Sequence, residues 1–353
     1  MKEIRVELGD RSYAIRVQPG LLDRFGFLLP KASSVAIVTD SNVGPLFAER
    51  AKYAISKGDL RAGVIEIQPG DENKNARTLE LVYNGMCGLG LDRSSLVIAL
   101  GGGVVGDVAG YAAATFMRGI RYVQVPTTLL ADVDSSIGGK TGINHPCGKN
   151  MIGAFHQPSA VFIDPATLQT LPERELSAGM AEVIKHGMIC DPEFFIFLES
   201  RAADVRDLHP KVIEHLIVRS CQIKAEVVAA DEREAGQRAI LNYGHTIGHA
   251  LEAITGYSRY RHGEAVAIGM NLAAQIARRL GMIDDEIVLR QARLLREFNL
   301  PTEPDGVDSA RLIELIHGDK KARGGKVRFV LPAGIGKVVV SDQVTDDMVR
   351  ELF

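Results

Sequence analysis

Four polar side chains typical of active sites recur along one predicted helix, residues 238–254. They are Arg238, Asn242, His245 and His249. Their spacing of i, i+4, i+7 and i+11 places them on one face of a continuous α-helix, while the apolar residues of the segment form a second stripe. A guanidinium that binds anions, an amide and two imidazoles differ from the Glu and Lys of a solvated face. The segment therefore predicts a functional site.

Further carboxylate and imidazole side chains predict a metal centre. Glu182, Lys185 and His186 share one face of another predicted helix, and His262 directly precedes a third. One carboxylate and two imidazoles, with a fourth position open for substrate, form the donor set of a catalytic zinc site. The HExxH pattern of metalloproteases is absent because a threonine follows His245. The residues alone leave open which two histidines bind, and each taken singly is also compatible with an ordinary structural histidine.

A glycine-rich turn follows the apolar run 96–100 and leads into an alanine-rich helix. Gly101, Gly103 and Gly106 match GxGxxG, a turn whose backbone amides approach a pyrophosphate at a helix N-terminus. The acidic residue expected about 20 positions later is missing, so this is not an ordinary Rossmann fingerprint. Asp40 ends an earlier apolar run, where its carboxylate either holds a ribose or caps the next helix.

The segment 132–150 combines several glycines with Lys140, Lys149 and Asn150. This composition suits a phosphorylated or carboxylated ligand, and the alternative is a surface loop with solvated lysines. We expect an irregular loop of about 20 residues, a length more often functional than idle. Arg118 and Lys224, each considered alone, resemble surface residues.

Alternating strand and helix patterns in the first half predict a mostly parallel sheet covered on both faces. The expected strands are 4–6, 13–17, 35–39, 64–67, 96–100, 121–125 and 161–163, the first two forming an antiparallel hairpin. The expected helices are 77–90, 107–116, 173–189, 192–199, 210–230, 238–255, 264–280 and 285–298, with a weak strand pair at 326–331 and 336–340. We expect an α/β domain over residues 1–165 and a mainly helical domain over residues 166–353.

Composition excludes several classes of protein. The 353 residues are 46% hydrophobic, with a formal net charge of −3 that favours neither nucleic acid nor an acidic membrane. No apolar run reaches the ~18 residues of a membrane span, and the first residues do not resemble a signal peptide. The four cysteines form no CxxC pair, which is typical of thiols in a reducing compartment. We expect a cytoplasmic globular protein.

Several motifs occur in an order that resembles one known family. They are Gly101 to Asp107, Pro126 to Ala131, Asp134 to Lys140, Ala181 to Gly187, Gly244 to Ala250, His262 to Glu264, and Asp319 to Lys321. From about residue 40 to residue 321 the chain resembles the 3-dehydroquinate synthases, which are sugar-phosphate cyclases. The resemblance implies an α/β domain and a helical domain, a homodimer, and dependence on NAD and on Zn²⁺ or Co²⁺. It also implies the shikimate-pathway conversion of 3-deoxy-D-arabino-heptulosonate 7-phosphate to 3-dehydroquinate and phosphate. That reaction proceeds by transient oxidation, phosphate elimination, reduction and aldol closure.

The resemblance also implies the roles of individual residues. The metal ligands are Glu182, His245 and His262. The catalytic residues are His249, Lys140, Lys185 and Asn150. The substrate contacts are Arg118 from a dimer neighbour, Asp134, Lys140, Asn150, Lys185, Lys224, Arg238, Asn242, His249 and Lys321, the last preferred over Lys320. The NAD site comprises Asp40, Asn42, Asp71, Lys74, Gly102, Gly103, Val104, Asp107, Thr127, Thr128, Lys149 and Thr170. Asp71 departs from the glutamate that the family usually has there.

Three other functions compete with this interpretation. A related sugar-phosphate cyclase that makes an inosose or a valiolone would differ among the residues that meet the substrate carboxylate and phosphate. Here the dehydroquinate type is matched at Lys140, Lys224, Arg238, Asn242 and His249. A metal-dependent polyol dehydrogenase would not need so many lysines around its substrate. A non-catalytic descendant would have lost at least one ligand, whereas every expected position is occupied.

Overall fold

The computed structural model describes residues 1–321 and 327–353, and of residues 319–321 only the backbone. The chain divides into two compact units. The first comprises Met1–Leu171 with Ile213–Glu232, and the second comprises Pro172–Val212 with Arg233–Phe353. Among the described residues, no helix has both the length and the hydropathy that crossing a bilayer requires.

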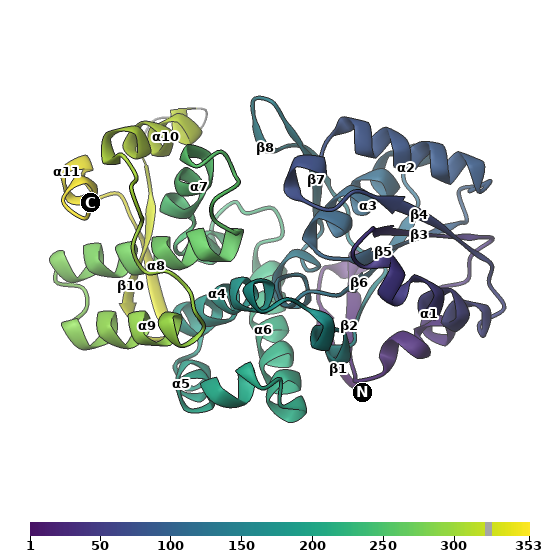
Figure 1. The fold of residues 1–353 in the computed structure, drawn as a ribbon, viewed down its shortest axis with the longest axis horizontal. Coiled ribbons are helices and arrows are strands. Elements are labelled where there is room, and N and C mark those ends of the chain that lie inside the picture. The colour runs from purple at the N-terminus through teal and green to yellow at the C-terminus, as the bar shows by residue number, and fades with distance from the viewer. Residues whose placement is uncertain (322–326) are drawn as a thin grey trace. The chain divides into compact units, whose positions relative to one another are not determined.

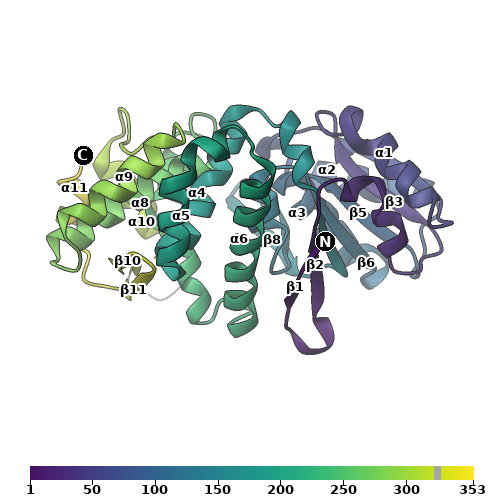
Figure 2. The same ribbon diagram turned by 90° about the horizontal axis from the view of Figure 1, so that it is seen from below.

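A seven-stranded sheet forms the centre of the first unit (Figure 1), in the order β1-β2-β9-β6-β5-β3-β4. Its strands are β1 (Lys2–Val6), β2 (Tyr13–Val17), β3 (Val35–Asp40), β4 (Ala62–Ile67), β5 (Leu96–Gly101), β6 (Arg121–Pro126) and β9 (Ala160–Ile163). All neighbours pair in parallel except β1 and β2, the antiparallel hairpin at one edge that Figure 2 shows beside the N-terminus. The mostly parallel sheet expected from the sequence is confirmed.

Helices cover both faces of this sheet. They are α1 (Gly44–Ser56), α2 (Ala76–Gly88) and α3 (Gly103–Thr115). Side chains alternate along a strand, so Val35 and Ile37 of β3 pack in the cluster that contains α1, whereas Ala36 and Val38 pack in the cluster that contains α2 and α3. Because both faces are buried, β3 and β5 consist of buried residues throughout.

Residues 140–155 form a hairpin of two strands, β7 (Lys140–His145) and β8 (Gly148–Phe155), so the expected irregular loop is wrong. Most of β8 is exposed, and the pair lacks the apolar alternation that predicts a strand. Glycines allow the pairing instead. A Cβ atom on Gly142 would lie 2.5 Å from the carbonyl oxygen of Ile152, and one on Gly153 2.2 Å from that of Thr141.

The second unit is mainly helical, as expected. The helices of this part of the chain are α4 (Glu173–Cys190), α5 (Pro192–Arg206), α7 (His245–Ile254), α8 (His262–Arg279), α9 (Asp285–Glu297), α10 (Ser309–Lys321) and α11 (Asp346–Arg350). Helices α8 and α9 run side by side in Figure 1. Helix α6 (Pro210–Ala230) groups with the first unit from Ile213 onward. The weak strand pair is confirmed as β10 (Phe329–Gly334) with β11 (Lys337–Ser341), and residue 326 of the expected range lies outside the described residues.

The helix expected over residues 238–255 is interrupted, so that prediction is wrong in its first third. Gln237–Asn242 forms a 3₁₀ helix, Gly244 has a φ of +81°, and α7 begins at His245. A Cβ atom on Gly244 would lie 2.7 Å from the carbonyl oxygen of Val266 and 2.9 Å from the backbone nitrogen of Met270 in α8, so close packing between backbones requires glycine here. Only His245 and His249 therefore keep the helical spacing.

Candidate active site

Three side chains with the donor atoms of a metal site meet in the second unit. Glu182 comes from the middle of α4, His245 from the start of α7 and His262 from the start of α8. Nε2 of His245 lies 3.5 Å and Nε2 of His262 lies 3.7 Å from Oε1 of Glu182. That oxygen is fully buried and accepts no hydrogen bond from any described residue. Two ligands each ~2.1 Å from a tetrahedral zinc ion lie about 3.4 Å apart, so the cluster fits a metal ion.

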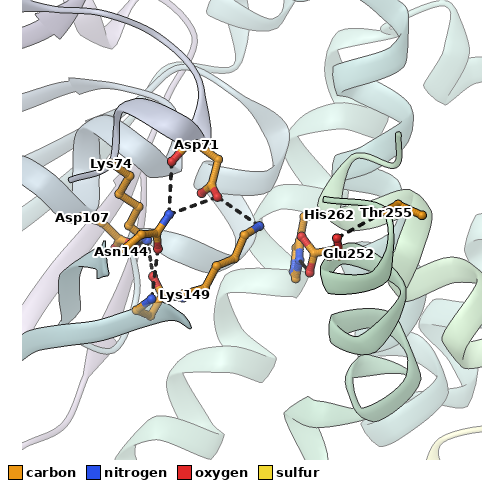
Figure 3. Close-up of polar contacts among 9 residues, drawn as sticks. Asp71, Lys74, Asp107, Asn144, Lys149, Glu252, Thr255 and His262 are labelled. Atoms are coloured by element: carbon orange, nitrogen blue, oxygen red, sulfur yellow. Dashed lines mark hydrogen bonds and ion pairs between the residues drawn. The ribbon is translucent and has the colours of Figure 1, made fainter. Parts of the chain in front are cut away.

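The second ring nitrogen of each histidine has a partner of its own. Nδ1 of His245 lies 3.1 Å from the carbonyl oxygen of Tyr243, and Nδ1 of His262 lies 3.2 Å from Oε2 of Glu252 (Figure 3). Burial, reinforced by the charge of Lys185, holds the pKa of His245 well below its ordinary value. His245 is thus a neutral imidazole, the form that binds metal ions. Glu252 is not among the residues predicted from the sequence, where its only signal is its position three residues after His249.

The third imidazole lies beside the cluster. The ring centroid of His249 is 5.3 Å from that of His245 and 6.0 Å from that of His262. His186, which shares α4 with Glu182, is fully buried. The structure thus brings His249 to the predicted metal ligands.

Arg238 and Asn242 belong to the 3₁₀ helix before α7. Arg238 is 3% exposed, and Nδ2 of Asn242 donates a hydrogen bond of 2.6 Å to Oε1 of Glu234, which the sequence analysis also missed. The side chain of Lys321 lies outside the described residues.

In the first unit, the glycine-rich turn lies at the carboxyl end of β5. After β3 the chain adds β4 on one side of that strand and then crosses over to add β5 on the other side. The boundary between β3 and β5 is therefore the topological switch point, at which α/β sheets bind ligands. Gly102 caps α3, and Cβ atoms on Gly102 and Gly103 would approach Thr128 and Ser135 to 3.2 and 3.0 Å. The first amides of α3 have no partner within the helix and carry its partial positive charge.

Other polar groups at this edge also suit a dinucleotide. The hydroxyl of Thr127 is buried and has no hydrogen-bond partner among residues 1–321 and 327–353. Oδ1 of Asp40 accepts hydrogen bonds of 2.9 Å from the backbone amides of Asn42 and Val43, which lie in the turn before α1, and the N-cap of α1 itself is Val43. Thr170 is exposed, and its hydroxyl donates to the carbonyl oxygen of Thr167.

A polar network joins the glycine-rich helix to the β7–β8 hairpin. Lys74 is 5% exposed, and its Nζ donates to Asp107 of α3 and to Oδ1 of Asn150 of β8 (Figure 3). The structure therefore brings together three residues that the resemblance placed in the NAD and substrate sites.

Asp71 belongs to the same region of the first unit. Its Oδ2 lies 3.1 Å from Nζ of Lys149 and accepts a hydrogen bond of 3.1 Å from Asn144, a residue that the sequence analysis did not select (Figure 3). The aspartate side chain is therefore long enough to reach Lys149.

Lys224 and Asp134 form a second ion pair in the first unit, in which the lysine is buried and the aspartate half-buried. Nζ of Lys224 lies 2.6 Å from both the carbonyl oxygen and Oδ1 of Asp134, and Lys224 is 5% exposed. Asp134 lies on a single π-helical turn, Ala131–Ser135, of the kind often found at functional sites. Lys140, which follows two glycines with positive φ, is exposed at the start of β7.

Arg118 is exposed on a strained turn. Its φ is +70°, that of Met117 is +49°, and Gly119 follows with +115°. Two consecutive non-glycine residues with positive φ cost roughly 1–3 kcal/mol each, and such strain clusters at functional sites.

The chain is similar in sequence to known proteins along nearly its whole length. Models of the 3-dehydroquinate synthase N-terminal and C-terminal domains match residues 64–178 and 179–322. The 3-dehydroquinate synthase of Nostoc punctiforme is 49% identical over 356 residues, covering 99% of this chain and 98% of the relative.

Two solved structures share the fold. A 2-epi-5-epi-valiolone synthase from Streptomyces hygroscopicus subsp. jinggangensis 5008, with NAD⁺ and Zn²⁺ bound, has a TM-score of 0.90 and 30% identity over 98% of this chain and 97% of that one. A 2-deoxy-scyllo-inosose synthase with carbaglucose-6-phosphate, NAD⁺ and Co²⁺ has a TM-score of 0.88 and 28% identity, covering both chains fully.

Proposed function

The chain belongs to the 3-dehydroquinate synthase family, and we propose that it converts 3-deoxy-D-arabino-heptulosonate 7-phosphate to 3-dehydroquinate and phosphate. The observation that carries the proposal is the cluster of the buried Glu182 with His245 and His262, whose donor atoms are spaced for one divalent ion. The enzyme is then a phosphate-eliminating lyase that regenerates its NAD⁺ in each turnover.

Zn²⁺ or Co²⁺ is held by these three residues, and NAD by the carboxyl edge of the sheet. When bound, the metal ion would polarise a substrate hydroxyl and NAD⁺ would accept a hydride and later return it. In this proposal residues 1–165 hold the nucleotide, with Gly102 and Gly103 against its pyrophosphate. Residues 166–353 hold the metal ion.

The remaining residues act by charge and position. The substrate carries a carboxylate and a phosphate, which the buried Lys185, Lys224 and Arg238 neutralise. Their burial strengthens each interaction because little water screens it. Lys140, Asn150 and Asn242 bind substrate oxygens, and Asp134 holds Lys224. A ring nitrogen of His249, beside the metal ligands, exchanges a proton with the substrate.

The active form is a cytoplasmic homodimer in which Arg118 contacts the phosphate bound by its partner. The exposed, strained turn at Arg118 supports this role, since a strained conformation persists where it is functional. The net charge of −3 gives no reason to expect nucleic acid or a membrane as a partner.

A substrate panel tests the proposal. The purified protein with NAD⁺ and Zn²⁺ is given the heptulosonate 7-phosphate, a ketoheptose 7-phosphate with hydroxymethyl in place of the carboxylate, and a set of simple polyols. We expect phosphate release and the mass of dehydroquinate from the first substrate alone. Faster turnover of the hydroxymethyl analogue would point to a sister cyclase. Lasting NADH from a polyol would point to a dehydrogenase.

A further inference from the structure

His262 is held at both of its ring nitrogens. Nε2 faces Oε1 of Glu182 at 3.7 Å, and Nδ1 lies 3.2 Å from Oε2 of Glu252. The imidazole thus stands between two carboxylates of the second unit, one from α4 and one from α7. Figure 3 shows Glu252 directed at the His262 ring.

Glu252 is poorly placed for any role at the surface. It is 3% exposed, and one turn before it the backbone of α7 packs closely against α8 at Gly248. A buried carboxylate is costly unless donors surround it, and an imidazole N–H is such a donor. Because a neutral imidazole carries one proton, a carboxylate at Nδ1 fixes that proton there and leaves the lone pair on Nε2.

We propose that Glu252 is the positioning residue of the metal site. It accepts the Nδ1–H of His262 and so presents Nε2 toward the ion held with Glu182 and His245. This inference rests on the proposed function only in that it uses the same three ligands. The carbonyl of Tyr243 does the same for His245, so both imidazole ligands are oriented from behind.

A rival arrangement uses the same atoms differently. Donor atoms of His249, Glu252 and His262 lie within 4.8 Å of one another and could themselves hold an ion. His262 would then bind one ion through each nitrogen. The observed hydrogen bond between Nδ1 and Glu252 occupies that nitrogen, which favours one ion per chain.

Cobalt titration of the full-length metal-free protein separates the two arrangements. Wild type, Glu252→Gln and Glu252→Ala are titrated with Co²⁺ by calorimetry and by the visible absorption of the bound ion. We expect one ion per chain in all three. Glu252→Ala should bind about 10–100-fold more weakly with an altered spectrum. Glu252→Gln should bind Co²⁺ more tightly than Glu252→Ala and keep most of the wild-type spectrum, because its amide oxygen still accepts the Nδ1–H of His262.

Glu264→Gln is the matched control. Glu264 lies in α8, two residues after His262, where it accepts bonds from Arg174 and from the backbone amide of Arg261. The change should lower the melting temperature without altering Co²⁺ affinity. If Glu264→Gln weakened Co²⁺ binding as much as Glu252→Ala does, any disturbance of α8 would be enough to weaken the metal site. That result would overturn the proposal.

Further results would also overturn the positioning role or the proposed function. Wild-type affinity in both Glu252 variants, or two ions per wild-type chain falling to one in Glu252→Ala, would overturn the positioning role. Phosphate release by the wild type is measured in parallel. Metal binding without phosphate release would count against the proposed function alone. A wild-type chain that binds no Co²⁺ would overturn both.

Discussion

Glu182 and Lys185 form an ion pair within one turn of α4, and their side chains are 0% and 1% exposed. The two oxygens of the Glu182 carboxylate have different partners. Oε2 pairs with the buried ammonium group of Lys185, and Oε1 lies beside His245 and His262. The metal-free protein depends on this pair because neither charge is solvated.

Removal of the carboxylate charge should therefore destabilise the metal-free protein. Glu182→Gln leaves the Lys185 charge buried without its partner and should cost about 3–5 kcal/mol. The double variant Glu182→Gln with Lys185→Met should recover most of this loss, because no buried charge remains. Denaturant unfolding of the metal-stripped proteins measures both. A single variant as stable as wild type would contradict the pairing.

Lys224 should be needed for both binding and turnover. Lys224→Ala removes a buried cation that meets the anionic substrate throughout the reaction, so KM should rise and kcat should fall. The loss in kcat/KM should be roughly 10–150-fold, the value of a hydrogen bond to a charged group. Steady-state kinetics with Lys211→Ala, an exposed lysine of the same helix, as control measures it. An unchanged kcat/KM would remove Lys224 from the site.

Asp132 should make the stability of the fold decrease as pH rises. It is fully buried, neither carboxylate oxygen has a hydrogen-bond partner among the described residues, and burial raises its pKa well above the ordinary range. The folded state then keeps a proton that the unfolded state releases above about pH 3.9. Stability is lost as pH rises from that value toward the folded-state pKa.

Asp132→Asn should thus raise the melting temperature, and more at pH 8 than at pH 5.5. Asp164→Asn is the control with the opposite expected effect. The buried Asp164 carboxylate accepts hydrogen bonds from the backbone amides of Gly20, Leu22 and Ala166, so this substitution should lower the melting temperature at both pH values. A melting temperature for Asp132→Asn that follows wild type at both pH values would show that the carboxyl is not protonated.

Arg118 should act in the partner subunit. Arg118→Ala and Arg238→Ala should each be nearly inactive alone. In a mixed dimer of the two variants, the site of the Arg118→Ala subunit keeps its own Arg238 and receives an intact Arg118 from the other subunit. The site of the Arg238→Ala subunit lacks both groups and stays inactive. Random exchange of equal amounts should therefore restore about a quarter of wild-type activity. Sedimentation would verify that subunits exchange, and mixed dimers without recovered activity would contradict the assignment.

The periodicity of apolar residues along the sequence predicted the sheet and most helices, because in these segments burial of one face decides the secondary structure. The α4 segment is one example, since the spacing of Glu182, Lys185 and His186 is itself helical. Gly244 is the opposite case. Its sequence context is helical, but its conformation is set by Met270 and Val266 of another helix, which no local pattern reveals.

Site residues divide in the same way. Glu182, His245 and His262 stand out by residue type, and the structure brings them together. Glu252, Glu234 and Asn144 resemble ordinary surface residues in the sequence, and only their partners give them a role. The β7–β8 hairpin was missed because close glycines, rather than apolar alternation, allow its strands to pair.

In the proposed reaction, NAD⁺ is reduced and reoxidised within each lyase turnover. The most direct test supplies the protein with 3-deoxy-D-arabino-heptulosonate 7-phosphate, Zn²⁺ and NAD⁺ far below the substrate concentration, and follows phosphate and the absorbance of NADH together. We expect many phosphates to be released per NAD⁺, with no lasting NADH. Phosphate release that stops at one per NAD⁺, or NADH that accumulates in step with product, would contradict the recycling of NAD⁺.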